Sequence, residues 1–177
     1  PSLSRRTIMS EVEKSLRRLG IETVDLYYAH KDHRADPLEE TLEAFDALKR
    51  MGRIRFAGCS NTVAWRIEQA RGLSRSRGWL AYCCVQQRHS YLRPAPGASF
   101  GAQTACNDDL LDYCRECPDV RLLAYTPLLA GAYTRDDKPL PHQYRGADSD
   151  ARLAALRAVA AETGATANQV VLAWMMQ

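Results

Sequence analysis

Apolar residues recur at helical spacing in six segments of the chain, and short, mainly apolar runs lie between them. The first helix is expected to begin after Ser4, whose side chain can cap it, and to end at Gly20. Asp36 has the features of a second helix start, because proline follows it and a glutamate stands three residues later. The other helices are expected over residues 63–73, from Asn107 or Asp108 to 116, over 150–163, and from Thr166 or Ala167 to the end.

The short apolar runs between these helices predict four β-strands. They cover residues 23–29, 53–58, 81–87 and 120–125. Each predicted strand is followed by a helix, and this order favours parallel strands joined by right-handed crossovers. The predicted fold class is therefore α/β.

Polar side chains stand at the carboxyl end of every predicted strand. They are His30; Ser60 with Asn61; Gln86; and Tyr125 with Thr126. No strand end carries the glycine-rich turn of a doubly wound nucleotide fold. Polar groups at successive strand ends are typical of the active-site mouth of a (β/α)8 barrel. We therefore expect a (β/α)8 barrel, with His30 where the first core strand opens into the mouth.

Composition changes this picture little. The chain has 177 residues, 46% apolar and 25% charged, which suits one globular domain over residues 1–177. Its net charge is +3, and its lysines and arginines are interspersed with acidic residues, so no nucleic-acid partner is expected. No run reaches the roughly 18 apolar residues of a membrane helix, and residues 1–10 hold no apolar leader core. A cytoplasmic protein without a membrane partner is the expectation.

The six cysteines are too scattered for a disulfide scaffold and fit a reducing compartment. Cys114 and Cys117 form a C-x-x-C, but they stand in a helical pattern without a second cysteine pair. Thiols on a helix face or in the core are therefore favoured over a redox or zinc site.

Five segments, in order along the chain, resemble the aldo-keto reductase family. They are "EKSLRRLGIETVDLYYAHKDH", "PLEETLEAFDALKRMGRIRFAGCSN", "VQQRHSYL", "LLAYTPLLAGAYT" and "AAETGATANQVVLAWMMQ". The likeness covers essentially all 177 residues. It implies a (β/α)8 barrel that reduces small aldehydes or ketones with NADPH, or sometimes NADH, and it implies no metal.

The resemblance also implies roles for residues at the strand ends. His30 would be the catalytic histidine, and Ser60, Asn61 and Gln86 would hydrogen-bond the nicotinamide carboxamide. Tyr125 would stack on the nicotinamide ring. The turn after it, formed by Thr126, Pro127, Leu128 and Gly131, would lie along the pyrophosphate. These residue types suit the chemistry, because an amide both donates and accepts, an aromatic face suits a flat ring, and a histidine can polarise a carbonyl oxygen.

The sequence also departs from the family. A tyrosine proton donor, an aspartate and a lysine are carried by earlier strands in the family, and nothing here corresponds to them. The chain resembles roughly strands four to seven of the eight, and the last strand with its basic loop has no counterpart. Four strands alone would leave two parallel edges exposed. The chain is therefore expected to be the central part of a longer enzyme.

Other interpretations stay open at this point. The chain could be a non-catalytic, nicotinamide-binding subunit that acts as a sensor or partner protein. A metal-dependent hydrolase is a weaker alternative, resting on His30, Asp32, His33 and Asp36 in one loop without a third ligand from another strand end.

Each site residue also has a plain structural interpretation. His30 could be a satisfied core histidine, Asn61 the cap of the helix near Val63, Gln86 a buried amide satisfied by backbone, and Tyr125 a core ring.

Arg88 and His89 depart from the family's strand motif. They would place charge or a titratable ring near the substrate mouth and could favour an anionic or phosphorylated carbonyl.

Overall fold

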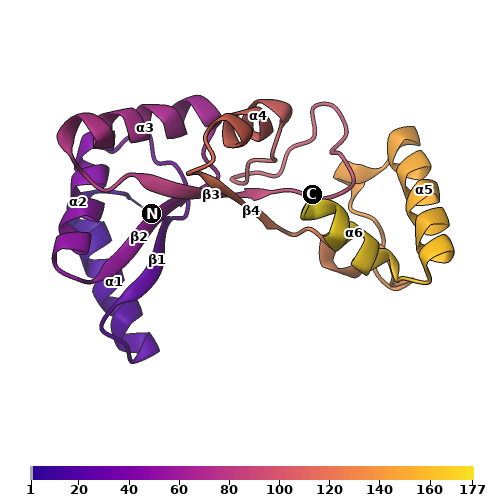
Figure 1. The fold of residues 1–177 in the computed structure, drawn as a ribbon, viewed down its shortest axis with the longest axis horizontal. Coiled ribbons are helices and arrows are strands. Elements are labelled where there is room, and N and C mark those ends of the chain that lie inside the picture. Colours follow the sequence, from indigo (N-terminus) through magenta and orange to yellow (C-terminus); the bar gives the residue numbers. More distant parts are fainter. Residues whose placement is uncertain (1) are drawn as a thin grey trace. The chain divides into compact units, whose positions relative to one another are not determined.

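The computed structural model describes residues 2–177, and within them helices and strands alternate as the apolar pattern predicts (Figure 1). The elements are α1 (Arg5–Leu19), β1 (Val24–Ala29), α2 (Leu38–Arg50), β2 (Ile54–Ser60), α3 (Ala64–Arg77), β3 (Tyr82–Arg88), α4 (Asp108–Glu116), β4 (Arg121–Tyr125), α5 (Ala147–Thr163) and α6 (Ala167–Met175). Two short 3-10 turns, η1 (Leu129–Gly131) and η2 (His142–Tyr144), lie between β4 and α5. The predicted α/β class is confirmed.

The four strands form one sheet in the order β1-β2-β3-β4. β1 pairs in parallel with β2, and β2 in parallel with β3, as crossover helices require. Ala29 lies opposite Cys59, and Ser60 lies opposite Gln86, so the carboxyl ends of these three strands are level with one another. A register shift between Ala57 and Gly58 lets β2 follow β3 to this end.

The chain forms two compact units. The first contains the residues up to Gln87 together with Cys106–Leu123, and the second contains Arg88–Ala105 together with Ala124–Gln177. Two compact units do not by themselves make two domains, so the single domain over residues 1–177 stays a prediction.

The core of the first unit lies between its helices and one face of the sheet. α1 contacts α2, and α2 contacts both β2 and α3 (Figure 1). α1 buries Ile8, Val12 and Leu16, and α2 buries Leu42, Phe45 and Leu48, which are the apolar positions at helical spacing. The alternation along β2 turns Ala57 and Cys59 into this core, whereas Phe56 on the other face is 54% exposed.

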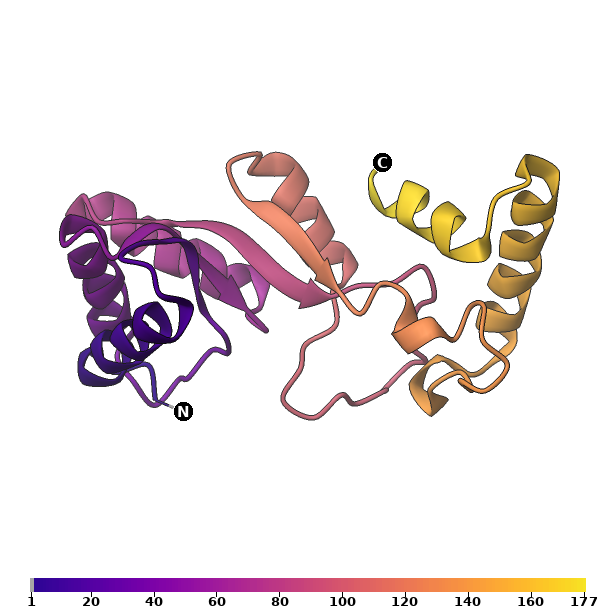
Figure 2. The same ribbon diagram turned by 90° about the horizontal axis from the view of Figure 1, so that it is seen from below.

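The second unit has a smaller core around Leu92, Leu129 and Tyr144. α6 turns back from the end of α5 after Gly164, and the two helices are in contact (Figure 2). A capping box joins Thr166 and Gln169 at the start of α6, which confirms the predicted helix start. No helix among residues 2–177 is long and apolar enough to cross a membrane.

Several helices and strands begin or end at residues other than those predicted. Ser4 caps α1 and Gly20 ends it as predicted, but α2 begins at Leu38 without a side-chain cap. The carboxylate of Asp36 is used elsewhere, as described below, so its prediction as a cap is wrong. β2 continues through Ser60 because that residue still pairs with β3. α3 runs on to Arg77, and α5 begins three residues earlier than predicted, at Ala147.

All six cysteines are free thiols. Cys114 lies in α4, and Cys117 follows at the end of that helix. Both pack against the core of the first unit, and burial raises the pKa of the Cys114 thiol. The predicted helix-face and core thiols are confirmed.

Candidate functional site

Asn61 links the carboxyl ends of three neighbouring strands in the first unit. Its backbone N–H donates to the carbonyl oxygen of Gln86 at 3.2 Å. Its side-chain nitrogen donates to the carbonyl oxygen of His30 and to the hydroxyl of Ser60, each at 3.1 Å. Asn61 has a φ of 53°, a left-handed conformation that asparagine tolerates better than most residues. α3 is capped by Val63 without a side-chain bond, so the interpretation of Asn61 as its cap is wrong.

His30 and Gln86 present side chains that no protein group engages. His30 is exposed just after β1, which rules out the satisfied core histidine. Gln86 is half-buried near the end of β3. Among residues 2–177, neither the imidazole of His30 nor the carboxamide of Gln86 has a hydrogen-bond partner. Both are therefore available to a ligand at this edge of the sheet.

Ser60 differs from these two residues. It is completely buried, and its hydroxyl accepts the hydrogen bond from Asn61. In this position it supports the Asn61 side chain. A direct contact of Ser60 with a carboxamide stays a prediction.

Gln87, and not Gln86, is the buried amide of this strand end. It is 1% exposed, its nitrogen donates to the carbonyl oxygen of Thr62 at 3.4 Å, and its oxygen has no partner among the described residues. The interpretation of Gln86 as a buried amide satisfied by backbone is therefore wrong, and its neighbour Gln87 is a buried amide of which only the nitrogen binds backbone. The alternation of strand side chains could have separated the two, because consecutive residues point to opposite faces.

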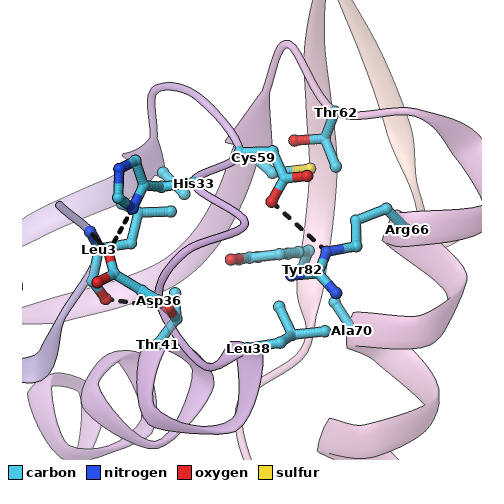
Figure 3. Close-up of a pocket in the computed structure, with 12 residues that line it drawn as sticks. Leu3, His33, Asp36, Leu38, Thr41, Cys59, Thr62, Arg66, Ala70 and Tyr82 are labelled. Carbon is cyan, nitrogen blue, oxygen red and sulfur yellow. Dashed lines mark hydrogen bonds and ion pairs between the residues drawn. The ribbon is translucent and has the colours of Figure 1, made fainter. Parts of the chain in front are cut away.

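The loop after β1 holds its charged residues in pairs (Figure 3). His33 contacts Asp36 at 2.8 Å, and Arg66 from α3 pairs with Asp32 at 3.5 Å. Arg34 pairs with the other oxygen of Asp32 at 3.2 Å. Among residues 2–177, no three His, Cys, Asp or Glu side chains come together as a metal site. The hydrolase alternative therefore gains no support.

Asp36 joins this loop to the start of the chain. Its carboxylate accepts hydrogen bonds from the hydroxyl of Ser2 at 2.9 Å, from the backbone N–H of Leu3 and from His33. Burial alone would raise the pKa of Asp36, but these hydrogen bonds hold it below the ordinary value. The loop beside His30 is therefore fixed at both ends, by Arg66 and by the N-terminal residues.

A small cavity lies beneath this loop, between the sheet and the helices (Figure 3). Its volume is about 10 Å³, and its lining includes Cys59, Arg66 and the buried ring of Tyr82. Burial raises the pKa of the Tyr82 hydroxyl far above its ordinary value. Such a cavity has room for about one water molecule and none for a carbonyl substrate. It is a packing feature behind the strand ends.

The end of β4, in the second unit, continues into an unusual turn. Thr126, Leu129 and Ala130 have φ values of 60°, 47° and 57°. With Asn61 they are the only non-glycine residues of the described chain in this region, and all four follow strand ends. Left-handed conformations are costly for β-branched and bulky residues and gather at ligand sites.

Hydrogen bonds close this turn from inside. The N–H of Leu129 donates to the carbonyl of Thr126 at 3.2 Å, and the N–H of Gly131 to that of Leu128 at 2.9 Å. Leu129 is also buried in the second core. The backbone N–H of Gly131 is thus used within the turn. The predicted pyrophosphate contacts of Thr126, Pro127, Leu128 and Gly131 stay predictions.

Arg88 lies against the ring of Tyr125. The guanidinium carbon is 5.6 Å from the centre of the Tyr125 ring and 4.5 Å from that of Phe100. Two guanidinium nitrogens, Nε and Nη2, donate to the side-chain oxygen of Gln103 at 3.1 and 2.7 Å. Burial raises the pKa of the Tyr125 hydroxyl, and Arg88 partly offsets this effect. Sequence reasoning missed Phe100 and Gln103, since they stand in an irregular loop.

His89 points to different neighbours. Its ring lies 5.9 Å from that of Trp174, and its backbone N–H donates to the carbonyl of Tyr125 at 3.3 Å. Burial lowers the pKa of its imidazole, which favours the neutral form. Of the two residues predicted to bring charge near the mouth, only Arg88 brings a permanent one.

Comparison with known proteins gives a consistent result. The family model described as "Aldo/keto reductase family" matches residues 1–177. Aflatoxin B1 aldehyde reductase member 4 of Homo sapiens is 33% identical over 141 residues, which are 77% of this chain and 39% of that protein. Aldo-keto reductase AMT2 of Alternaria alternata is 25% identical, over 98% of this chain and 47% of its own length.

A solved structure described as a 2,5-diketo-D-gluconic acid reductase B superposes with a TM-score of 0.69 at 22% identity. The match covers 96% of this chain and 48% of that one, which supports the expected partial barrel fold. The chain spans less than half the length of these relatives. By the match of the family model over its whole length, the chain belongs to the aldo/keto reductase family.

Proposed function

We propose that the protein reduces an aldehyde or ketone to an alcohol, with NADPH, or else NADH, as the hydride donor and a small carbonyl compound as substrate. The observation that carries the proposal is the His30 imidazole, exposed at the end of β1 without a protein partner while Asn61 holds its backbone. The family membership and the relatives named as reductases support the same chemistry.

The residues at the strand ends suit a nicotinamide. A bound nicotinamide supplies the hydride, and the residues of this chain hold and orient it. The half-buried carboxamide of Gln86, which has no partner among the described residues, can both donate to and accept from a carboxamide. Asn61 hydrogen-bonds to His30, Ser60 and Gln86 and so fixes the ends of β1, β2 and β3. The ring of Tyr125, backed by Arg88, offers a flat aromatic surface.

His30 is proposed to act on the substrate. Its imidazole can donate a hydrogen bond to the carbonyl oxygen, on which negative charge develops as hydride arrives at carbon. The carbonyl carbon must be held about 3 to 3.5 Å from the hydride donor, which a fixed strand end favours over a mobile loop. The family's tyrosine, aspartate and lysine have no counterpart in the 177 residues.

The test compares His30→Gln with His142→Gln in the purified protein, using a panel of aldehydes and NADPH or NADH consumption. His142 is exposed in η2 and serves as the matched control. We expect His30→Gln to lower kcat/KM by about 10²-fold, the contribution of one well-placed donor, and the control to leave it unchanged. Equal activity of the two variants would refute the role of His30.

A non-catalytic, nicotinamide-binding subunit is the second candidate, because the same strand-end groups of Gln86 and Asn61 would serve it equally well. Titration of the purified protein with NADPH and NADH, followed by the change in nicotinamide fluorescence, separates the two. Saturable binding without turnover of any carbonyl would support the subunit. Turnover that requires His30 would support the reductase.

A further inference from the structure

An open pocket lies between the ends of α2 and α3, wholly within the first unit. Its volume is about 450 Å³, and its lining includes Asp46, Lys49 and Arg50 of α2, Arg77 at the end of α3, and Trp79 and Leu80 before β3. Small-molecule sites typically have volumes of about 300–1,000 Å³. Leu80 leads into the start of β3, whereas Gln86 lies near its end, so the pocket is at the opposite end of the strand from the candidate functional site.

The wall of this pocket carries more positive than negative charge. Lys49, Arg50 and Arg77 line it, against the single acid Asp46. The Lys49 ammonium has no hydrogen-bond or ion-pair partner in the described chain. Arg50 pairs with Asp46 at 3.3 Å and Arg77 with Glu39 at 2.6 Å, but the two arginine side chains are 66% and 53% exposed. Pairs of such exposed arginines are weak, so an anion in the pocket can compete for them.

Helix polarity explains only part of this charge. Basic residues in the last turn of a helix complement its dipole, and α2 and α3 both end in this way. Here two helix ends meet at one pocket, so three cations share its wall. The last carbonyls are capped within the chain, since the N–H of Gly52 donates to that of Lys49 and the N–H of Trp79 to that of Ser74, each at 2.9 Å. These caps reduce the negative charge that a helix end would present to an anion.

Trp79 adds an aromatic side chain that the structure holds in place. It is half-buried, and the guanidinium carbon of Arg77 lies 5.8 Å from the centre of its ring. The next residue is fixed on both sides, because the N–H of Leu80 donates to the carboxylate of Asp46 at 2.9 Å and its carbonyl accepts from the hydroxyl of Ser74 at 3.1 Å. A planar ring can therefore stack on an indole that is already in position.

We propose that this pocket binds an aromatic phosphate, with the ring of the ligand on Trp79 and its phosphate on Lys49, Arg50 and Arg77. A phosphate suits three cations better than a carboxylate does, because it carries up to two negative charges and three strong acceptor oxygens. The proposal is independent of the reductase function, since the pocket shares no residue with the strand ends around His30.

Calorimetric titration of the purified protein with 1-naphthyl phosphate tests the site. Titrations with 1-naphthol and with inorganic phosphate measure the two halves of this ligand separately. We expect saturable binding of 1-naphthyl phosphate, at least about tenfold tighter than that of either half, because it gains both the charged contacts and the stacking. Binding no tighter than that of inorganic phosphate would overturn the proposal.

Two exposed basic residues at helix ends give a matched pair of variants. Lys49→Gln removes the cation without a partner and should weaken binding of 1-naphthyl phosphate by about tenfold. Arg18→Gln removes an exposed cation from the last turn of α1, outside the pocket, and should leave binding unchanged. Equal affinities in the two variants would contradict the assignment.

Trp79→Leu keeps an apolar side chain against the core of the first unit but removes the flat ring. It should weaken 1-naphthyl phosphate by about fivefold or more and leave inorganic phosphate unchanged. An unchanged affinity for 1-naphthyl phosphate would refute the stacking. Where Trp79→Leu is poorly folded, the comparison of Lys49→Gln with Arg18→Gln decides the question alone.

Competition with NADPH distinguishes this pocket from the proposed cofactor site. Binding of 1-naphthyl phosphate that persists at saturating NADPH, and that Lys49→Gln weakens, would support the pocket. Displacement by NADPH together with an unchanged affinity in Lys49→Gln would place the ligand in the cofactor site and overturn the proposal. Failure of the proposed reductase function would show itself as absence of carbonyl turnover, on which none of these titrations depends.

Discussion

The side-chain amide of Asn61 donates a hydrogen bond to the backbone carbonyl of His30 at 3.1 Å, so the residue after β2 fixes the residue after β1. Since the backbone N–H of Asn61 also binds Gln86, one side chain and one peptide group hold three strand ends together. Because this hydrogen bond uses the backbone of His30, its imidazole stays available to a ligand.

Substitution of Asn61 should therefore weaken the fold in two separable ways. Asn61→Gly removes the side-chain hydrogen bonds but tolerates the φ of 53°, and should lower the free energy of unfolding by about 1–2 kcal/mol. Asn61→Ala should lower it by about 1 kcal/mol more, because a Cβ without a polar group is strained in this conformation. Urea unfolding of both variants measures the difference. Equal stabilities would show that the conformation carries no cost.

Gly58 allows β2 to lie close to its neighbours. A Cβ there would come within 2.5 Å of the Cys84 sulfur and 2.7 Å of the Tyr28 ring. Gly58→Ala should therefore lower the free energy of unfolding by about 1–3 kcal/mol, the usual cost of overpacking. Gly72, inside α3, would meet only one atom at 3.9 Å. Gly72→Ala is the control and should raise stability by about 0.5–1 kcal/mol. Thermal and urea unfolding measure both.

Arg71 ties α3 to α4 and to the segment before β4. It is buried and donates to the hydroxyl of Tyr113 at 3.1 Å and to the carboxylate of Asp119. Arg71→Met should lower the free energy of unfolding by about 2–3 kcal/mol, since it leaves these partners without a donor. Arg75→Met removes only an exposed pair with Glu68 and should cost less than about 0.5 kcal/mol. Similar losses in both variants would contradict this assignment.

Burial of His89 should make stability depend on pH. Because burial lowers the pKa of its imidazole below the ordinary 6.5, the unfolded chain binds this proton more readily. The contribution is complete above about pH 6.5 and is lost as the pH falls through the lower, folded-state pKa. His89→Phe keeps a ring against Trp174 and should reduce the loss of stability between about pH 7.5 and about pH 5.5. His142→Phe, at an exposed position, should retain it.

Local signals in the sequence predict most of the fold. Ser4 and Gly20 bound α1 because a capping hydroxyl and a residue free to turn left-handed act within a few residues. The alternation of strands and helices predicts parallel pairing, and the polar strand ends, which favour a barrel, predict the sequential strand order. Asp36 shows where local signals fail. It has the sequence environment of a cap, but Leu3 and His33 compete for its carboxylate from other segments.

The site is predictable in part for the same reason. Polar residues at strand ends direct attention to His30 and Gln86, whose side chains have no hydrogen-bond partner among residues 2–177, while their predicted roles stay predictions. The hydrogen bonds between distant residues are not predictable. Asn61 binds His30 across 31 positions of sequence, and Arg88 binds Gln103 across 15. Contacts of that span depend on how crossovers and loops pack. No periodicity in a single sequence records them.

Cys59 offers a way to time the opening of the sheet. Its thiol is 1% exposed in the middle of the sheet, donates weakly to the carbonyl of Cys84 at 3.8 Å, and has its pKa raised by burial. Only the thiolate reacts with alkylating reagents, so the folded protein protects this sulfur both by access and by charge. Its rate of alkylation under native conditions, measured by mass spectrometry of the peptide, should therefore report how often β2 separates from its neighbours. The protein carries that reporter without any added label.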